Sequence, residues 1–397
     1  MTYEWNHSTI NDVCVLVTDG SHSSPKSVND GKYMVSVKDF TDYGFDFASC
    51  RMISNDDYET LKRNGCVPQI DDILIGKDGA RFFEDIIIYR QREKPALLSS
   101  IAILRCDKSK ILPDFLYYVL RTPSFRQDVK DNYGSGSAIP RIILKDFKRM
   151  MVSYPSLEKQ QAIISVLTAI DSKIQANTEI NDNLYAQAKA IFDNHFINID
   201  AIPAGWRKGN LLDIANYLNG LAMQKFRPQG NEIGLPVLKI KELRQGSCDD
   251  SSELCSLRIK PEYIIHDGDV IFSWSGSLLV DIWCGGTCGL NQHLFKVTSD
   301  IYDKWFYYLW TAHHLARFIA IAADKATTMG HIKREELAKA EVLIPCEDDY
   351  TSLTSIMQPI FELIISNRIE ARKLAALRDE LLPKLMSGEI DVSAIQL

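Results

Sequence analysis

The hydrophobic pattern of this 397-residue chain occurs twice, and the second copy lies about 190 positions after the first. Over 157–196 and again over 353–385, apolar residues recur in alternating steps of four and three, which is helical spacing. The matching positions are Ile163, Leu167, Ile170, Ile174, Leu184 and Ile191 in the first stretch, and Leu353, Met357, Ile360, Ile364, Leu374 and Leu381 in the second. Solenoid repeats have periods of roughly 20 to 50 residues. The longer period here indicates a duplicated pair of domains.

Each of these stretches predicts a long helix with a heptad seam, which is typical of a helix that packs along another helix. Pro155 and Pro345 stand just ahead of the two stretches, where proline is compatible with a helix start. Pro359 lies inside the second stretch and predicts a kink or a delayed start. A helix of 40 residues is about 60 Å long. Neither helix has a helical neighbour in the sequence, so we expect the two to pair with each other.

An asparagine repeats inside the seam, as Asn177 and Asn367. If a pseudo-twofold axis relates the halves, the helices run antiparallel and these two amides face each other, each satisfying the other. A buried seam asparagine lowers stability but fixes register. The alternative is that each asparagine points to solvent.

The segments outside the helices also repeat, in the same order. The segment from Trp5 to Gly20 matches that from Trp206 to Gly220, and Asp72-Ile-Leu-Ile matches Asp269-Val-Ile-Phe. Short β-rich runs bounded by Gly, Asp, Asn and Pro predict strands. The predicted strands are 13–17, 33–37, 72–75, 86–88 and 101–104 in the first half and 237–240, 270–272 and 341–344 in the second, with a helix at 113–120.

These patterns predict an α+β protein with two α/β-mixed globular domains, separated by two long antiparallel coiled-coil helices in pseudo-twofold duplicated halves. The expected blocks are a first globular domain at 1–150, a central spacer helix at 151–200, a second globular domain at 201–346, and a C-terminal spacer helix with a tail at 347–397.

Charge and cysteine content narrow the function. The net charge is −7, yet both globular blocks are neutral and both helical blocks are acidic. A chain that grips DNA alone usually carries a basic surplus, so a partner would supply part of the phosphate neutralisation. Nine scattered cysteines suit a reducing compartment. Cys284 and Cys288 have no second ligand pair at zinc spacing, which favours buried thiols over a metal site. No apolar run is long enough to span a membrane.

Motifs of catalysis are absent from the sequence. The chain has no phosphate loop of the form G-x-x-x-x-G-K-[ST] and no Asn/Asp-Pro-Pro-aromatic tetrapeptide, which amino-methyltransferases use to hold a base. Asp171-x-Lys173 lies on the seam helix and resembles a nuclease site only as D-x-K. We therefore expect no catalysis by this chain alone.

Three motifs resemble the specificity subunits of type I restriction–modification systems. Val-Ser-Tyr-Pro-Ser-Leu-Glu-Lys-Gln-Gln-Ala-Ile at 152–163 is similar to the entry of that family's central helix. Pro-Ala-Gly-Trp at 203–206 is similar to the opening of its second half, and Leu-Arg-Asp-Glu-Leu-Leu-Pro-Lys-Leu-Met-Ser-Gly-Glu-Ile at 377–390 to its C-terminal tail. With the duplication, the resemblance covers essentially the whole chain.

The resemblance implies a non-catalytic subunit in which each globular domain is a target-recognition domain for one half of a bipartite DNA site. The helices would act as a ruler and dock two methyltransferase subunits, which bind S-adenosylmethionine. Motor-nuclease subunits, which use ATP and Mg, would complete the restriction enzyme. The expected location is the cytoplasm of a prokaryote. No cofactor or metal is expected in this chain, and double-stranded DNA is the expected ligand.

Polar, glycine-bearing loops at matching places in both halves are the candidate DNA contacts, because direct readout needs Arg, Lys or amide side chains on exposed loops. The candidates are His22, Lys77, Arg81, Ser135, Ser137 and Arg141 in the first half, and Lys225, Arg227, Trp274, Ser275, Lys325, Thr327, Thr328 and His331 in the second. The loops after Asp72 and Asp269 differ, Lys-Asp-Gly against Trp-Ser-Gly. The two half-sites are therefore expected to differ in sequence.

Two alternatives remain. The chain is a duplicated scaffold whose neutral globular domains bind protein without base readout, or a fragment of a single-chain restriction enzyme. The second is disfavoured because the chain starts and ends at landmarks of the resembled family.

Overall fold

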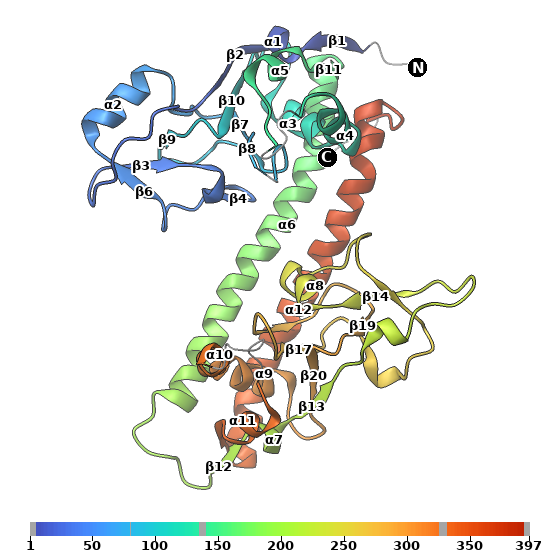
Figure 1. Ribbon diagram of the computed structural model, residues 1–397. Coiled ribbons are helices and arrows are strands. Elements are labelled where there is room, and N and C mark those ends of the chain that lie inside the picture. The colour runs from blue at the N-terminus through green and yellow to red at the C-terminus, as the bar shows by residue number, and fades with distance from the viewer. Residues whose placement is uncertain (1–4, 80, 135–139, 325–331, 393–397) are drawn as a thin grey trace. The chain divides into compact units, whose positions relative to one another are not determined.

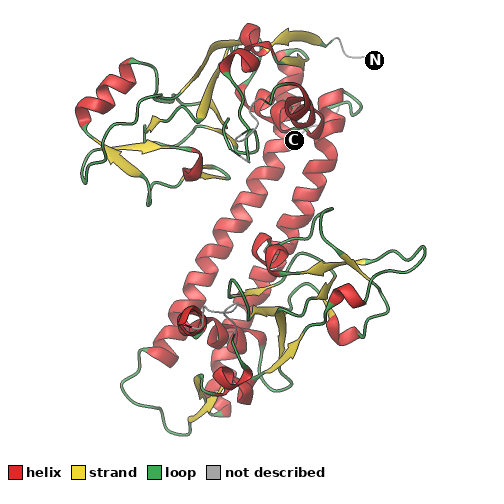
Figure 2. Cartoon of the chain, viewed as in Figure 1, coloured by secondary structure: helices red, strands yellow, loops and turns green. Residues whose placement is uncertain are grey.

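The computed structural model describes residues 5–79, 81–134, 140–324 and 332–392. The chain divides into two compact units, Met1–Asp171 with Ala376–Leu397, and Ser172–Ala375. Figures 1 and 2 show both units as mixed helix and sheet. Two long helices, α6 (Leu157–Phe192) and α12 (Glu347–Ser387), each contribute residues to both units. The four sequence blocks therefore remain a prediction, whereas the α+β class of the two duplicated halves is confirmed.

The first unit is built mainly from short strands. Its strands are β1 (Asn6–Thr9), β2 (Cys14–Asp19), β3 (Lys32–Val35), β4 (Phe40–Thr41), β5 (Gly44–Phe45), β6 (Arg51–Ile53), β7 (Ile73–Gly76), β8 (Ile86–Ile88), β9 (Ala96–Leu97), β10 (Ile101–Cys106) and β11 (Met151–Tyr154). Its shorter helices are α1 (Ile10–Val13), α2 (Asn55–Arg63), α3 (Pro113–Arg121), α4 (Pro123–Asn132) and α5 (Leu144–Arg149), with a 3-10 turn at Val37–Asp39.

The central sheet of the first unit has the order β2-β10-β7-β8, with antiparallel pairing throughout. A second sheet has the order β6-β3-β9, with β3 and β9 parallel. Strands β4 and β5 form a hairpin, and β1 pairs with β11. This last pairing joins Asn6 to Tyr154, so strands from the two ends of the first globular segment lie side by side.

The second unit repeats the plan. Its strands are β12 (Arg207–Asn210), β13 (Asn216–Asn219), β14 (Leu235–Leu238), β15 (Leu254–Cys255), β16 (Ile264–Ile265), β17 (Val270–Ser273), β18 (Leu279–Ile282), β19 (Cys288–Leu290), β20 (Leu294–Thr298) and β21 (Glu341–Ile344). Its shorter helices are α7 (Leu211–Ile214), α8 (Ile240–Gln245), α9 (Lys304–His313), α10 (Leu315–Asp324) and α11 (Arg334–Ala338), with 3-10 turns at Met223–Lys225 and Pro261–Tyr263 and a π-helical turn at Asp193–Ile197.

The sheets of the second unit match those of the first. The order β13-β20-β17-β18 corresponds to β2-β10-β7-β8, and β12 pairs with β21 as β1 pairs with β11. The second sheet here has four strands, β15-β14-β19-β16, and keeps the parallel pair in β14 and β19. The expected strands are thus confirmed, with ends shifted by a few residues.

Local sequence explains why both copies fold alike. Thr9 caps α1 through a reciprocal bond with Asp12, and Asn210 caps α7 in the same way with Asp213. Gly20 and Gly220 follow the first strand of each central sheet. A Cβ there would lie 2.3 Å from the carbonyl oxygen of Leu97 and 2.2 Å from that of Asn291, so only glycine fits.

The two long helices pair antiparallel within each unit. In the first unit, Ile163 and Leu167 of α6 share a hydrophobic core with Leu382 and Leu385 of α12. In the second unit, contacts advance from Asn177 to Asn181 on α6 as they retreat from Glu370 to Ile364 on α12. None of the predicted seam residues is exposed. Supercoiling of the pair and the twofold relation between the halves stay predictions.

Two details of the helices differ from expectation. Asn177 and Asn367 are both buried, but their amides do not satisfy each other. The Asn177 amide donates to Glu370 at 2.7 Å and to the backbone oxygen of Asn367 at 3.4 Å, while the Asn367 amide donates to Asn181 at 3.0 Å. Each asparagine thus bonds a side chain on the facing helix near the other asparagine, Glu370 for Asn177 and Asn181 for Asn367, rather than the other amide. Helix α12 also begins twelve residues before Pro359, so the expected delayed start is wrong.

Candidate nucleic-acid interface

Three predicted loops of the first unit meet at one end of its central sheet. The backbone N–H of Lys77, directly after β7, donates to Ser100 O at 2.9 Å, and Ser99 N–H donates to Ser21 O at 2.9 Å. The third loop joins them because Gly79 N–H donates to Pro140 O at 2.9 Å. The segments around His22, Lys77 and Arg141 therefore form one surface, as matching loop positions predicted.

Lys77 lies inside this surface rather than on it. It is only 7% exposed, and its ammonium lies 3.3 Å from the Asp19 carboxylate and 3.8 Å from that of Asp78. A buried cation requires such a partner. Lys77 is thus matched by Asp19 within the protein, and its side chain holds the loop after β7 to the end of β2.

Two exposed candidates of the first unit, His22 and Arg141, lie beside that pair, and Arg81 lies farther along the loop after β7. The His22 side chain is 77% exposed, with its ring 3.3 Å from Asp19, and the Arg81 side chain is 72% exposed and bonded to Asp85 at 2.7 Å. Arg141 is also exposed, and its backbone forms an isolated antiparallel β-bridge with the backbone of Asp78. Ser135 and Ser137 lie outside the described residues. His22, Arg81 and Arg141 are therefore the residues best placed to meet a ligand.

The same end of the central sheet in the second unit, called the corner here as in the first unit, is formed by different residues. Trp274, directly after β17, donates its backbone N–H to His293 O at 3.3 Å, the counterpart of the Lys77–Ser100 bond. Its indole N–H donates to the Asn219 amide at 2.9 Å, where the first unit has Lys77 and Asp19. Ser275 is buried and its hydroxyl lies 2.9 Å from the His293 ring. A neutral, hydrogen-bonded corner replaces a charged one.

The remaining candidates of the second unit that the structure describes are Lys225 and Arg227. Lys225 and Arg227 are exposed beside the second sheet, where Arg227 is bonded to Glu253 at 2.9 Å. Glu253 immediately precedes β15, and Ser256 just beyond that strand donates its N–H to Phe226 O. Lys325, Thr327, Thr328 and His331 lie outside the described residues. Ile332, the next described residue, donates its N–H to Trp274 O at 2.9 Å.

Sequence reasoning missed Asp19, Asn219 and His293, which complete the two corners. Asp19-Gly20 and Asn219-Gly220 occupy matching places in the duplicated sequence, so the repeat itself carried the signal for the first two. The position of His293 depends on the return of β20 beside β17, which no local pattern reveals.

An ion pair lies at the other end of the same strands in each central sheet, away from the corner. Asp72 is fully buried and accepts two bonds of 2.8 Å from Arg105, whereas Asp269 accepts one of 2.8 Å from Lys296. Each carboxylate also accepts a backbone N–H from three residues upstream, at Gln69 and His266. The residue before each carboxylate is left-handed, with φ +70° at Asp71 and +89° at Gly268.

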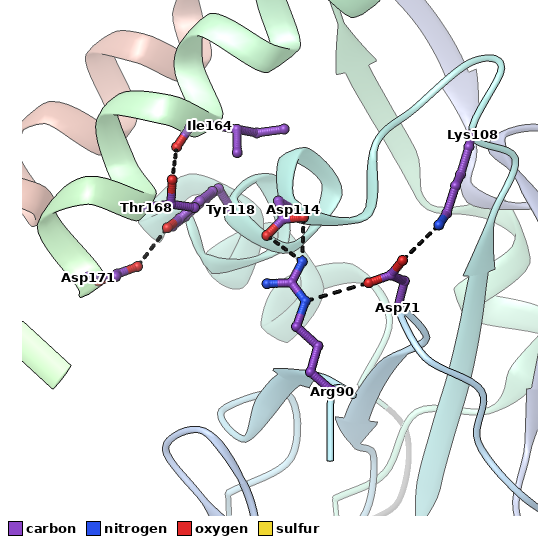
Figure 3. A network of polar contacts seen from close by, with 8 residues as sticks. All are labelled: Asp71, Arg90, Lys108, Asp114, Tyr118, Ile164, Thr168 and Asp171. Atoms are coloured by element: carbon purple, nitrogen blue, oxygen red, sulfur yellow. Dashed lines mark hydrogen bonds and ion pairs between the residues drawn. The ribbon is translucent and has the colours of Figure 1, made fainter. Parts of the chain in front are cut away.

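Polar contacts fix each globular domain to the long helices within its unit. In the first unit, Tyr118 of α3 donates to Asp171 of α6 at 2.7 Å (Figure 3), and Arg378 of α12 bonds the same carboxylate at 2.9 Å. Burial, then the bond to Asp171, raises the pKa of Tyr118. In the second unit, Arg368 and Arg372 of α12 each form two hydrogen bonds of 2.7–2.8 Å, Arg368 with Asp281 and Arg372 with Asp267.

The described residues give no sign of metal chemistry. Cys284 and Cys288 are buried, and burial raises the pKa of the Cys284 thiol. No group of three His, Cys, Asp or Glu side chains suited to a metal ion occurs among residues 5–79, 81–134, 140–324 and 332–392. Across those same residues, no helix has both the length and the apolar character needed to cross a membrane.

Comparison with known proteins decides the family. A model of the type I restriction modification DNA specificity domain matches residues 3–186 and again 203–376, one copy for each half. The chain belongs to this family. It is thus a specificity subunit of a type I restriction–modification system, the component that has no catalytic role of its own.

Named relatives agree. The type I restriction enzyme MjaIX specificity subunit of Methanocaldococcus jannaschii is 28% identical over 313 residues, covering 72% of this chain and 71% of the relative. The HindI specificity subunit of Haemophilus influenzae is 19% identical over 368 residues, covering 72% and 80%. The crystal structure of a type I S subunit from M. genitalium is 15% identical with a TM-score of 0.53 over 96% of each chain, which supports the fold.

Proposed function

We propose that this specificity subunit reads a bipartite DNA sequence, with one half-site for each globular domain. The observation that carries the proposal is the pair of matching corners. Both copies hold three loops at the same end of the same sheet, but they fill the corner with Lys77 and Asp19 in one case and Trp274 and Asn219 in the other. Two domains with the same sheet but different side chains at its end suit two different half-sites. Base edges are distinguished by the hydrogen-bond donors and acceptors that contact them.

Within this proposal, the exposed polar side chains of the first corner contact DNA directly. These side chains are His22, Arg81 and Arg141, on loops that the buried Lys77–Asp19 pair holds at the ends of β2 and β7. Arginine forks suit guanine edges and phosphates alike. In the second corner, the ring of Trp274 and the Ser275–His293 pair take the equivalent place.

The partners follow from the charge. Both globular blocks are neutral and the chain as a whole carries −7, which argues against tight DNA binding by this chain alone. We propose two methyltransferase subunits, each with S-adenosylmethionine, as the partners that neutralise phosphates. Motor-nuclease subunits using ATP and Mg would form the complete restriction complex in the cytoplasm of a prokaryote.

The long helices are proposed to act as a ruler between the half-sites. Half-sites one turn of DNA apart require a spacer of about 34–36 Å, and helices of 36 and 41 residues exceed that length at 1.5 Å per residue. One heptad inserted into each helix keeps the seam facing its partner and adds about 10 Å. The non-specific gap should then grow by about three base pairs, with both half-sites unchanged. An unchanged gap refutes the ruler.

The test of DNA reading is base-resolution mapping of adenine methylation in cells that carry this chain with its methyltransferase subunit. We expect a bipartite motif with two unlike halves, which disappears in cells with the methyltransferase alone. Replacing residues 5–154 by another recognition domain should change one half of the motif only. If the motif survives that replacement, the globular domains do not read DNA, and the scaffold alternative holds.

A further inference from the structure

A cavity of about 240 Å³ lies in the first unit, where the turn between α3 and α4 faces the last part of α12. Its wall contains three arginines, Arg121, Arg126 and Arg378, together with Tyr118 and Asp379. Three cations and one carboxylate leave the wall with a surplus of positive charge.

The charges of this wall are unequally matched. Arg378 is balanced by Asp171 at 2.9 Å and by Asp379 at 2.8 Å. Neither Arg121 nor Arg126 forms an ion pair with any carboxylate of the described residues. Arg121 instead donates to the Tyr117 hydroxyl and lies 4.9 Å from the centre of the Tyr117 ring. Both unmatched guanidinium groups therefore face the same cavity.

Arg126 is the group that most requires a ligand. Its Nε is buried and has no hydrogen-bond partner among the described residues, while its Nη2 reaches Glu84 O at a long 3.3 Å. The Glu84 carboxylate lies 3.8 Å from Lys130 instead. Burial, and then the neighbouring charge of Arg121, lowers the pKa of Arg126. A half-buried cation without a partner lowers stability, and an anion in the cavity would relieve it.

The backbone adds to the same field. Helix α4 has ten residues and begins at Pro123, which lines the cavity. Its N-cap residue, Thr122, satisfies only the N–H of Phe125. The positive end of the helix dipole therefore lies beside the two unmatched arginines, and the three features favour a compact anion with several acceptor oxygens.

We propose that this cavity is a site for a single phosphate group, held by the guanidinium groups of Arg121 and Arg126. Arginine forks bind phosphate through two parallel bonds. Arg126 also donates to the backbone oxygen of Glu84, in the loop that carries Arg81. A phosphate that fixes Arg126 would therefore also stabilise this loop of the candidate DNA surface. The phosphate comes from the DNA backbone or from the free anion. The DNA source, but not the free one, rests on the proposed function.

The first experiment is calorimetric titration of the full chain with inorganic phosphate, at an ionic strength held constant with chloride. We expect saturable binding, weakened at least tenfold in both R121M and R126M. The matched control is R63M, which removes an exposed arginine of α2 that bonds only within its own helix. Thermal melts without phosphate verify that each variant folds. No saturable binding, or binding that both variants retain, overturns the proposal and reduces the cavity to a packing defect.

The second experiment distinguishes the sources by the salt dependence of duplex binding, measured on the chain with its methyltransferase subunit. If the DNA backbone fills the site, R126M should lower the slope of log affinity against log salt by about one, and phosphate should compete with the duplex. If the free anion fills it, the slope stays the same while phosphate binding is lost. A chain that binds phosphate but no DNA keeps the site and refutes only the proposed function.

Discussion

The two recognition domains share a frame and differ at its rim. Both have the same order of strands in the central sheet and a capped short helix just before the first strand of that sheet. In both, an aspartate at the start of the third strand bonds a cation on the neighbouring strand. At the other end of that strand, the first domain buries an ion pair, whereas the second has an exposed hydrogen bond between an indole and an amide. The two copies thus share the strand order, the helix cap and the ion pair that stabilise the sheet, but they differ in the side chains at its exposed end.

The frame itself is not equally strong in the two copies. Asp72 is fully buried and receives two bonds from Arg105, whereas Asp269 is 22% exposed and receives one from Lys296. We expect D72N to lower the free energy of unfolding by about 3 kcal/mol, since it leaves a cation without its buried partner. D269N should lower it by about 1 kcal/mol. Urea denaturation, with hydrogen exchange to locate the weakened unit, measures both. Equal losses would show that the two frames are equivalent.

The corners provide the next comparison. K77M leaves the Asp19 carboxylate, only 8% exposed, with His22 as its remaining partner, and should lower stability by about 2 kcal/mol. W274F keeps an aromatic ring beside Phe295 and loses one neutral hydrogen bond to Asn219, which should lower stability by about 1 kcal/mol. Thermal melts compare the two variants. A larger loss in W274F would contradict the charged and neutral assignments of the corners.

The repeated asparagines should respond with opposite signs. The side-chain oxygen of Asn177 is buried without a hydrogen-bond partner among the described residues, whereas its amide nitrogen bonds Glu370, whose side chain is 46% exposed. N177L removes the unsatisfied oxygen, and water can replace the lost bond to Glu370, so the variant should be more stable by about 0.5 kcal/mol. N367L removes the bond to Asn181 and should destabilise by about 1 kcal/mol. Urea denaturation of the two single variants decides this. The same sign in both would mean that the two amides act as one symmetric pair.

The smallest effect concerns the left-handed turn before the buried aspartate, filled by Asp71 in one copy and by Gly268 in the other. Asp71 is bonded to Lys108 at 2.7 Å and to Arg90 at 3.5 Å (Figure 3). The hydrogen bond from Lys108, against the opposing effect of burial, holds the pKa of Asp71 below its ordinary 3.8.

A lowered carboxylate pKa adds stability that is fully present above 3.8 and is lost as pH falls through the folded value. We expect wild type to exceed D71N by about 0.5 kcal/mol at neutral pH, with the difference vanishing below the folded pKa of Asp71. Denaturation across pH, with the exposed Asp56→Asn as control, measures it. A difference that persists in strong acid would assign the effect to the turn conformation.

Much of this architecture was predictable because it depends on short-range patterns. Helical spacing located α6 and α12, and β-rich runs located β7, β10 and β17, since periodicity reports directly which face is buried. The repeat also predicted that the loops around His22, Lys77 and Arg141 belong to one surface. These features need only the order of residues along the chain.

What escaped prediction depends on which strands become neighbours. The local sequence predicts that Lys77 is exposed, but in the structure it is buried because β2 ends beside it and Asp19 forms an ion pair with it. Arg227 lies beside a second sheet whose strands pair in a non-sequential order. The amide of Asn177 prefers Glu370, one turn along α12, to the asparagine that the repeat offered. Long-range pairing therefore decides the chemistry of single residues, although it leaves the elements as the sequence predicts them.

The most direct test of the shared frame is a chain that carries the first recognition domain twice, with residues 206–344 replaced by a copy of residues 5–154. These junctions lie at matching ends, because β1 pairs with β11 as β12 pairs with β21. Adenine methylation would be mapped in cells that carry this chain with the methyltransferase subunit. We predict an inverted repeat of the first half-site with the original gap. A motif that keeps the second half-site would contradict the assignment of one half-site to each domain.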